Sequence, residues 1–438
     1  MENILVANVS IDRPDLAGRH VFALQMRRWK GPMLEAYFPG TRFDYLPLYL
    51  SPKAFFRDWK ATILATPNSA LLVWGRNIPD EVLKFARENS IPVYFMEDGF
   101  IRSLAANASH SLSFSLTLDS RTPYFDSRQA SDLENILATY DFAADPALIA
   151  RARLAMDKLL ASGLSKYNAP AAISASVAEV ETRPTTRRIL VIGQVEDDAS
   201  IQLGCDRLVN NNDLVRLAAS ENPGCEILYK PHPDVLNGVR KRLSDPSDVA
   251  HLATIVTDPV PLPQLLDRVD HVYTITSLGG FEALMRGKPV TAFGMPFYAG
   301  WGLTDDRQAS PRRGRKLAVE EVFAAAYLLY PRYFDPVEGA EISFETCFEN
   351  ALQWRKSGMP ESRIASAQMP PKPAFALSGP YGLLGWRHLM TPFVARLIAT
   401  IGSADDVTDY RTNPILFFRE LSNPKLRRLG RLLYPHDG

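Results

Sequence analysis

Short apolar runs alternate with amphipathic stretches over the first part of the chain. Residues 4–9, 70–74 and 93–96 are apolar runs of the length that fully buried strands have, and residues 79–89 have helical spacing. Because strands that alternate with helices form parallel sheets covered on both faces, this pattern predicts an α/β domain over about residues 1–180.

The same alternation starts again after a polar, proline-containing segment at residues 182–188, which we interpret as a linker. The candidate strands that follow predict a second α/β domain over residues 185–345. These strands are residues 188–193, 226–230, 255–257, 271–274 and 290–293. Residues 131–163 are predicted to be helical, with Ser131 and Glu134 as a capping box. Two Rossmann-like domains facing across a cleft would bring the carboxyl ends of both sets of strands to one site.

The remaining residues, 346–438, are predicted to form a linker and a helical tail. Residues 360–380 are rich in Pro, Ser and Ala, as linkers are. Residues 411–438 carry several Lys and Arg residues against only Glu420 and Asp437, interleaved with apolar side chains. Such a segment is typical of either a tail helix with a solvated basic face or an interfacial segment on anionic lipid.

Composition limits the class of protein. A chain of 438 residues predicts more than one domain, and 46% hydrophobic with 22% charged residues is typical of a globular protein. Lys and Arg (49) balance Asp and Glu (49), so the chain has no overall electrostatic preference for nucleic acid.

The cysteines and the first residues indicate in which cellular compartment the protein is expected. Cys205, Cys225 and Cys347 are scattered, which argues against a zinc site or a disulfide framework and favours a reducing environment. The first residues resemble a strand rather than a signal peptide, and no apolar run is long enough to cross a membrane. We therefore expect a cytoplasmic protein.

A strand, a glycine-rich turn and a helix start follow one another at residues 273–286. Free backbone N–H groups and the helix dipole make such a turn a site for an anion, such as the phosphate of a sugar nucleotide. Ser277, Gly279 and Gly280 form the turn, and Glu282 is expected in the first turn of the helix. Glu282 either contacts the ligand or only complements the dipole.

Two acidic segments follow predicted strands. Glu97 and Asp98 come shortly before Arg102, so they either contact substrate or close a turn through an internal ion pair. The segment 193–200 contains three successive acids that end in Asp198. Asp198 either faces the cleft as a nucleophile or base, or caps a helix that starts near Ser200.

Two further segments contain candidate ligand contacts. Prolines hold His232 in an extended loop, from which it and Lys230 can donate to phosphate or carboxylate oxygens, with Asp234 just beyond. Tyr298 and Trp301 lie in an aromatic, glycine-containing loop that either stacks on a sugar ring or caps the sheet.

In this order and spacing, the segments resemble the KpsC family of capsular polysaccharide proteins, which are similar to retaining β-Kdo glycosyltransferases. The matching segments are EDGFIRS (97–103), SDLE (131–134), SKYN (165–168), GQVEDDASI (193–201), KPHPD (230–234), SLGGFEALMRGKPV (277–290), FGMPFYAGWGLTDD (293–306) and YPRYFDP (330–336). The resemblance covers about residues 90–345 and one of the two tandem modules of KpsC. After Ser103, Leu104-Ala105-Ala106 replaces the glycine-containing turn of the family.

The resemblance implies a GT-B-like fold, CMP-Kdo as donor, and a lipid-linked or Kdo-terminated glycan as acceptor. It implies that Asp198 is the nucleophile, that Glu97 is the acid/base group or activates the acceptor, and that His232 assists catalysis. The implied donor-binding residues are Gln194, Ser200, Lys230, Ser277, Gly279, Gly280 and Glu282, and the implied substrate-binding residues are Asp98, Arg102, Asp234, Tyr298 and Trp301. No metal or further cofactor is expected, because Lys230, His232 and a helix N-terminus can neutralise the single phosphate of CMP-Kdo.

The resemblance also implies binding partners, and two alternative functions remain open beside it. The expected partners beyond donor and acceptor are the inner-membrane surface, on which the protein would be peripheral, and capsule export machinery, with no nucleic acid. A rhizobial-type relative that processes lipopolysaccharide or K-antigen fits the same segments. Two other interpretations stay open: a non-catalytic processing, export or chain-length factor that uses the same cleft, and an epimerase of the UDP-sugar 2-epimerase type, whose architecture is shared.

Overall fold

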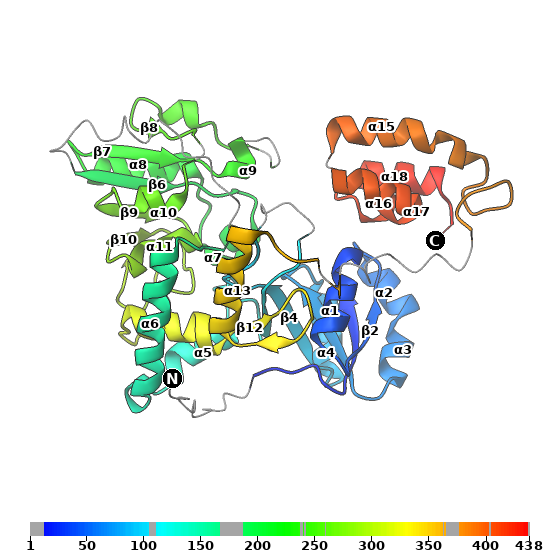
Figure 1. The fold of residues 1–438 in the computed structure, drawn as a ribbon, viewed down its shortest axis with the longest axis horizontal. Coiled ribbons are helices and arrows are strands. Elements are labelled where there is room, and N and C mark those ends of the chain that lie inside the picture. Colours follow the sequence, from blue (N-terminus) through cyan, green and yellow to red (C-terminus); the bar gives the residue numbers. More distant parts are fainter. Residues whose placement is uncertain are drawn as a thin grey trace.

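The computed structural model describes residues 13–104, 111–166, 187–236, 240, 242–258, 260–361, 363–364, 376–402 and 404–436. The predicted first strand at residues 4–9, most of the predicted linkers at 182–188 and 360–380, and Ala105 and Ala106 lie outside these residues. The described chain forms two α/β units and a C-terminal group of helices (Figure 1).

The first unit is built on a seven-stranded sheet. Its strands are β1 (His20–Leu24), β2 (Arg42–Tyr45), β3 (Ser69–Trp74), β4 (Val93–Asp98), β5 (Ser115–Asp119), β12 (Arg332–Phe334) and β13 (Glu341–Ile342). They lie in the order β13-β12-β5-β4-β3-β1-β2, with β1 to β4 parallel and β5, β12 and β13 joined by antiparallel pairings. The strands predicted at residues 70–74 and 93–96 are therefore confirmed.

Helices cover both faces of this sheet because successive side chains of each strand point to opposite sides. Val21 and Ala23 pack in the cluster that contains α1, whereas Phe22 and Leu24 pack with α2, α3 and α4. The helical elements are η1 (Arg28–Lys30), α1 (Gly31–Tyr37), α2 (Pro52–Asp58), α3 (Lys60–Ala65) and α4 (Asp80–Glu88), the last within the predicted 79–89.

The second unit contains a six-stranded parallel sheet. Its strands are β6 (Arg188–Ile192), β7 (Glu226–Lys230), β8 (Thr254–Ile255), β9 (His271–Thr274), β10 (Val290–Ala292) and β11 (Asp305–Asp306). The order β11-β10-β9-β6-β7-β8 is the 3-2-1-4-5-6 order of doubly wound nucleotide-binding sheets. The predicted architecture of two Rossmann-like units of the GT-B kind is thus confirmed, and all five strands predicted here form.

The helices of the second unit pack on both faces of its sheet. They are α7 (Ala199–Gly204), α8 (Asn211–Glu221), α9 (Pro233–Leu236), η4 (Pro246–Val249), α10 (Leu262–Leu266) and α11 (Leu278–Met285). Three further elements contact α6 (Pro146–Ser162), namely α12 (Val319–Phe323), the π-helical turn η5 (Ala324–Leu329) and α13 (Phe344–Ser357), and α13 also contacts β12 of the first sheet. Ile189 and Val191 pack with α7 and α8, and Leu190 and Ile192 pack on the opposite face, where α11 lies.

Two stretches cross between the units. The sequence predicted residues 131–163 in the first domain, but α5 (Asp132–Thr139), η2 (Phe142–Ala144) and α6 (Pro146–Ser162) bury their apolar side chains in one cluster with the second sheet. Conversely, β12 and β13 fall within the predicted second domain and pair with β5 of the first sheet. The chain therefore leaves the first unit and returns to it.

The predicted capping box at Ser131 and Glu134 forms only in part. Ser131 Oγ accepts the Glu134 N–H at 3.0 Å, as expected for an N-cap. The Glu134 carboxylate, however, accepts from Arg312 Nε at 2.6 Å and from Arg313 Nη2 at 2.8 Å. Glu134 therefore ties α5 to the loop after β11 instead of closing the box.

The C-terminal helices form a separate small core. They are η6 (Gly385–Met390), α15 (Thr391–Ile401), α16 (Ala404–Thr412), α17 (Pro414–Glu420) and α18 (Pro424–Leu433). Tyr410, Ile415 and Phe418 are buried within this unit. Part of the apolar side of the predicted basic tail therefore belongs to an internal core. None of the helices in the described part of the chain is long and apolar enough to cross a membrane.

Candidate functional site

The order of strands in the second sheet reverses between β6 and β9, so the loops that follow them diverge and leave a crevice. Gln194 follows β6 and Thr276 follows β9. The Gln194 amide joins them, because its Nε2 donates to Thr276 Oγ1 at 3.1 Å and its Oε1 accepts the Thr276 N–H at 2.7 Å. Thr276 Oγ1 also lies 3.4 Å from Ser200 Oγ. Gln194 and Ser200, both predicted donor-site residues, therefore lie together at the crevice between β6 and β9.

The glycine-rich turn after β9 packs tightly on the sheet. Ser277 caps α11 by accepting the Gly279 N–H at 3.2 Å. A Cβ on Gly279 would lie 2.7 Å from a Leu262 methyl, and one on Gly280 would lie 2.9 Å from the Thr274 methyl. Both glycines are therefore needed for close helix–sheet approach, which brings the N-terminus of α11 to the crevice.

Glu282 does not lie where the sequence predicted. The helix begins at Leu278 and includes Gly279 and Gly280, which were predicted to form the turn before it, so Glu282 is in its second turn and is buried. Burial raises the pKa of Glu282 to about 7, against the opposing charge of Arg286. Its carboxylate accepts no hydrogen bond from another described residue, so it keeps its hydrogen-bonding capacity.

The three successive acids after β6 have different surroundings. The Glu196 carboxylate holds the loop by accepting from Asn211 N at 2.7 Å and from Ser244 N at 2.9 Å. Asp197 pairs with Arg240 at 2.9 Å on the surface. Asp198 Oδ1 accepts the Ser200 N–H at 2.8 Å and caps α7, as one of the two sequence interpretations expected. Its Oδ2 accepts no hydrogen bond from the described residues and remains available to a ligand.

His232 lies beside Asp198 and Asp234 at the end of β7. Its Nδ1 accepts the Asp234 N–H at 3.1 Å, which leaves the proton of the neutral ring on Nε2. Burial lowers the pKa of His232, although Asp234 and Asp198 oppose that shift. Burial also lowers the pKa of Lys230, against the charge of Asp258. Two groups that can donate to phosphate thus follow one strand.

A second cluster gathers at the carboxyl edge of the first sheet. Glu97 lies beside Gly75, where a Cβ would be 3.2 Å from Glu97 Oε1. Burial and the neighbouring Asp98 raise the pKa of Glu97 to about 7. Lys30 extends over the Trp74 ring, and burial lowers its pKa to about 7 against the charges of Asp98 and Glu97. Glu97 and Lys30 therefore both change charge near neutral pH.

Asp98 and Arg102, two predicted substrate contacts, are paired with each other. Arg102 Nε donates to Asp98 Oδ2 at 2.9 Å, and Ser113 donates its hydroxyl proton to Asp98 Oδ1. Burial opposes the charge on Asp98, but Lys30 and Arg102 outweigh it and lower the pKa of this carboxyl. The internal ion pair that the sequence left as an alternative is therefore present.

Tyr298 and Trp301 do not offer a stacking surface. Both side chains are 0% exposed, and Trp301 Nε1 donates to the Phe297 carbonyl at 2.8 Å. The Tyr298 hydroxyl donates to the Ser277 carbonyl, behind the glycine-rich turn. The predicted contact of these rings with a sugar is therefore wrong for this conformation. They cap the sheet, because aromatic rings in a tight loop lose more water-exposed area by packing inward.

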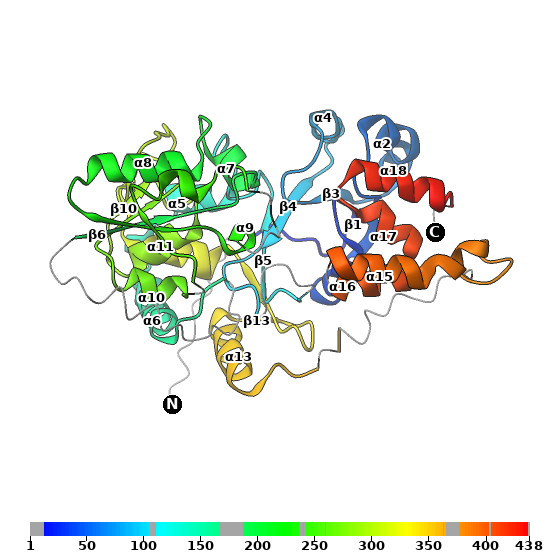
Figure 2. The same ribbon diagram turned by 90° about the horizontal axis from the view of Figure 1, so that it is seen from above.

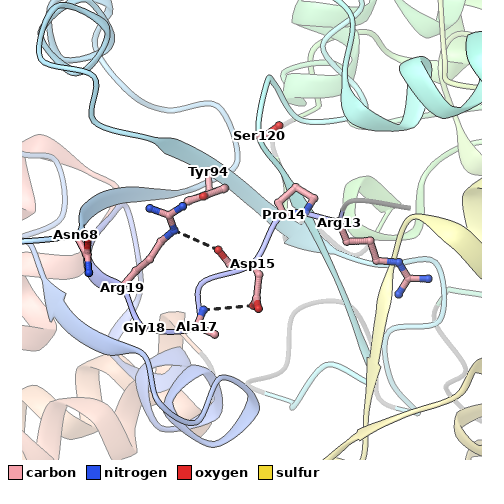
Figure 3. A pocket seen from close by; sticks show the side chains of 9 residues that line it. All are labelled: Arg13, Pro14, Asp15, Ala17, Gly18, Arg19, Asn68, Tyr94 and Ser120. Atoms are coloured by element: carbon pink, nitrogen blue, oxygen red, sulfur yellow. Dashed lines mark hydrogen bonds between the residues drawn. The ribbon is translucent and has the colours of Figure 1, made fainter. Parts of the chain in front are cut away.

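Two hollows lie on different edges of the sheets. One of about 480 Å³ is lined by Arg76, Asp126 and Arg128 of the first unit and by Ala199, Gln202 and Leu203 of α7, next to Asp198. The other, of about 570 Å³, contains Arg13, Arg19 and Tyr94 (Figure 3). Arg19 and Asn68 in that hollow precede β1 and β3, so it lies at the amino ends of parallel strands. Ligands in such sheets bind at the carboxyl ends, so the smaller hollow is the better candidate.

Residues from distant parts of the chain approach this hollow. Figure 2 shows α7 and α9, which follow β6 and β7, on the side of the second unit that faces β4. Asp198, His232 and Lys230 therefore lie near one another at the carboxyl edge of the second sheet, and Glu97 and Asp98 end β4 of the first sheet. Sequence reasoning missed Lys30 and Thr276. Lys30 follows the apolar run of β1, and that run was the signal that could have found it.

No group of three or more His, Cys, Asp or Glu side chains within the described ranges has the arrangement of a metal site. The groups that could hold a nucleotide are cationic or neutral donors, namely Lys230, His232 and the capped start of α11.

Comparison with known proteins shows the family to which the chain belongs. The family described as "Capsule polysaccharide biosynthesis protein" matches residues 69–333. The lipopolysaccharide-processing protein LpsZ of Rhizobium meliloti is 44% identical over 76% of this chain and 74% of its own length. The capsule polysaccharide modification protein LipA of Neisseria meningitidis is 36% identical over 74% of this chain, but only 44% of LipA is covered.

Solved structures of Thermosulfurimonas dismutans KpsC are also similar. One, titled as a beta Kdo 2,4 transferase, is 31% identical with a TM-score of 0.62, and the match covers 76% of this chain and 98% of that one. The other, titled as a beta Kdo 2,7 transferase, has the same identity and TM-score over 77% of this chain and 100% of that one.

Proposed function

Because the chain belongs to the capsule polysaccharide biosynthesis protein family, we propose that it is a glycosyltransferase acting in capsule or lipopolysaccharide biosynthesis. The donor is a CMP-sugar, with Kdo or a related acidic sugar as the group transferred. The acceptor is a lipid-linked or Kdo-terminated glycan. The Kdo-transferase titles of the two similar KpsC structures support the choice of sugar.

One observation carries the proposal. At the reversal point of a 3-2-1-4-5-6 sheet, Asp198 keeps one carboxylate oxygen available, beside His232 with its proton on Nε2. Lys230 and the start of α11 complete a cationic and N–H-rich surface for one phosphate. A carboxylate beside a phosphate-binding surface is the arrangement that a retaining transfer through a covalent intermediate requires.

The proposed reaction has two displacements. In the first, an oxygen of Asp198 forms a bond to the anomeric carbon while the bond from that carbon to the CMP phosphate oxygen breaks, and CMP leaves with the electron pair. His232 Nε2–H donates to the departing phosphate. In the second, an acceptor hydroxyl oxygen forms a bond to the anomeric carbon while the bond from that carbon to the Asp198 oxygen breaks. Asp198 leaves as a carboxylate with the electron pair and Glu97 takes the hydroxyl proton, so two inversions retain the configuration.

Glu97 is the group we assign to the acceptor hydroxyl. A pKa of about 7 allows it to be ionised in a substantial fraction of molecules at neutral pH and to accept the hydroxyl proton. Lys30 stabilises the ionised form, since its charge lowers the pKa of Glu97 against the effect of burial. A protein peripheral to the inner membrane would meet a lipid-linked acceptor at Glu97, on the first-sheet wall of the proposed cleft.

The decisive experiment compares two neighbouring acids. The protein is incubated with CMP-Kdo and a synthetic Kdo-terminated acceptor, CMP release is measured, and the product's anomeric configuration is determined by NMR. Asp198→Asn should lower kcat on the order of 10⁴-fold, as loss of a nucleophile does, while Asn keeps the cap of α7. Asp197→Asn removes an exposed neighbouring charge and should retain activity.

Two results would count against the proposal. Equal activity of Asp198→Asn and the wild type would exclude Asp198 as nucleophile. CMP-Kdo binding without CMP release, with every acceptor tried, would instead favour the non-catalytic processing or chain-length role.

A further inference from the structure

The outer side of the C-terminal unit carries a row of exposed apolar side chains, which we call the α15 ridge. Their exposed fractions lie between 45% and 78%, and they are Trp386, Leu389, Met390, Phe393, Leu397 and Ile401. A monomeric protein rarely leaves a contiguous apolar surface of this kind open without a binding role.

The ridge follows from the helical period. Phe393, Leu397 and Ile401 are four residues apart along α15, so they lie on one side of the helix. Trp386 and Leu389 are three apart in η6, whose 3₁₀ period keeps them in line. The opposite side of α15 buries Ala395 and Ile398 in the core of the unit. The helix is therefore already packed on one side, and the ridge is a second apolar face.

Basic residues outnumber acidic residues in the unit that carries the ridge: residues 376–436 contain eight Lys and Arg residues against Asp405, Asp406, Asp409 and Glu420. Residues 376–404 contain Arg387 and Arg396 but no Asp or Glu. The Arg387 guanidinium lies 5.1 Å from the centre of the Trp386 ring, at one end of the ridge. In the same unit, residues 422–436 carry only basic charges, at Lys425, Arg427, Arg428 and Arg431. An anionic partner is therefore complementary to this unit.

Figures 1 and 2 both show α15 on the side of the C-terminal unit that lies away from α2, and the exposure of its ridge side chains shows that the rest of the described chain does not cover them. Two copies meeting ridge to ridge would bring Arg387 and Arg396 of both together, which is unfavourable. An anionic lipid surface has no such conflict, because acyl chains receive the apolar side chains while phosphates meet the arginines.

We propose that η6 and α15 lie in the interface of a membrane that contains anionic phospholipid, with the α15 ridge inserted. Trp386 then occupies the headgroup level that tryptophan favours. The sequence left lipid contact by residues 411–438 as one of two interpretations, whereas the ridge lies before them and those residues supply part of the core and of the positive charge.

The attachment of this unit gives the ridge a connection to the site. The Arg28 N–H donates to Glu420 Oε1 at 3.3 Å, and the Arg427 guanidinium lies 3.9 Å from the centre of the Tyr49 ring. Arg28 belongs to η1, which ends at Lys30. The membrane-bound unit is thus joined to the segment that brings Lys30 to Glu97.

The test uses the full chain and vesicles without donor or acceptor, so its outcome is independent of the proposed glycosyltransferase activity. Vesicles of equal parts phosphatidylethanolamine and phosphatidylglycerol are compared with phosphatidylcholine vesicles in a flotation assay. The wild type should bind the anionic vesicles. Trp386→Ser with Phe393→Ser should lower that partitioning about a hundredfold, since two large apolar side chains no longer insert. Arg387→Gln with Arg396→Gln should lower it about tenfold and reduce the preference for anionic lipid.

Two control variants make the assignment specific. Leu154→Ser with Leu208→Ser removes exposed leucines from the α/β part of the chain, outside the C-terminal unit, and should bind as the wild type does. Leu426→Ser with Leu429→Ser changes exposed leucines of α18 and should reduce partitioning less than the ridge variant does.

Three results would overturn the proposal. In the first, ridge variant and wild type bind vesicles equally. In the second, the α18 variant alone loses binding, which assigns the lipid surface to the tail. In the third, light scattering finds a dimer that the ridge variant dissociates while neither form binds vesicles, which makes the ridge a contact between copies.

Discussion

The two walls of the proposed cleft hold their charges in different ways. At the first sheet, Asp98 and Arg102 are satisfied by each other, and Glu97 and Lys30 have pKa values moved toward neutrality by burial. At the second sheet, Asp198 uses one oxygen for a helix cap, and His232 accepts one backbone N–H. The first wall has its charge set by the fold, whereas the second keeps groups available for a ligand.

This difference shows that adjacent acidic residues after a strand can either form a structural ion pair or remain available to bind a ligand. A buried ion pair contributes shape and a fixed field, and removing one partner is costly. A capping carboxylate uses only one of its two oxygens for the cap, and replacing it by Asn, which also caps helices, costs little stability. Variants of the two walls should therefore affect different measurements.

The largest difference in stability should come from Asp98→Asn. The change removes the carboxylate that Arg102, only 4% exposed, faces at 2.9 Å, and we expect a loss of about 3 kcal/mol in the free energy of unfolding. Asp198→Asn on the other wall should cost less than about 0.5 kcal/mol because Asn also caps helices. Urea unfolding of both variants measures the contrast, and equal losses would erase the distinction between the walls.

A smaller, pH-dependent effect is expected from Glu97→Gln. Glu97 has a pKa of about 7 in the folded protein, against about 4.3 for an unfolded chain. Between these values the folded state binds more protons, so the contribution of Glu97 makes the wild type less stable as pH rises. The Gln variant should match the wild type near pH 4 and exceed it by about 2 kcal/mol at pH 8, a gain kept small because Lys30 loses an attractive charge.

Urea unfolding at the two pH values tests this effect, with Glu81→Gln on the exposed side of α4 as the control for loss of a carboxylate. A gain from Glu97→Gln that is the same at both pH values would show that Glu97 is not held protonated by burial.

The smallest effect should appear in ligand affinity on the second wall. His232→Ala removes one donor to phosphate and should weaken CMP binding about tenfold in calorimetry at pH 7. His251→Ala, an exposed histidine of the same unit, is the matched control. If both variants bind CMP like the wild type, the open groups of this wall face something other than the nucleotide.

Parts of the fold were predictable because buried parallel strands are continuous apolar runs. Five strands of the second sheet, together with β3 and β4, were predicted in this way, whereas β11, which consists of two aspartates, was not predicted. The three residues of β12 and the two of β13 are too short to give a pattern, and only their pairing with β5 places them. No local signal tells a strand which sheet it will join.

The candidate site was predictable where a polar or charged residue stands at the carboxyl end of a predicted strand. Lys230 and Ser277 came from their positions at strand ends and Gln194 came from the family resemblance, and the structure gathers all three at one edge of the second sheet. The helix start was misplaced because Gly279 and Gly280 suggest a turn, whereas close packing against Ile192 and Thr274 keeps them inside α11. Tyr298 and Trp301 were misassigned because an aromatic loop has the same composition whether it faces a ligand or the core.

The return of the chain to its first sheet has a consequence for biosynthesis. On the ribosome, β5 emerges long before β12, since about two hundred residues separate Asp119 from Arg332. The first sheet is therefore incomplete until the whole second unit has been made, and β5 presents an unpaired edge during that interval. A nascent chain stalled before Ile342 would expose that edge to other chains, so the order of synthesis itself sets a window in which this protein is open to aggregation.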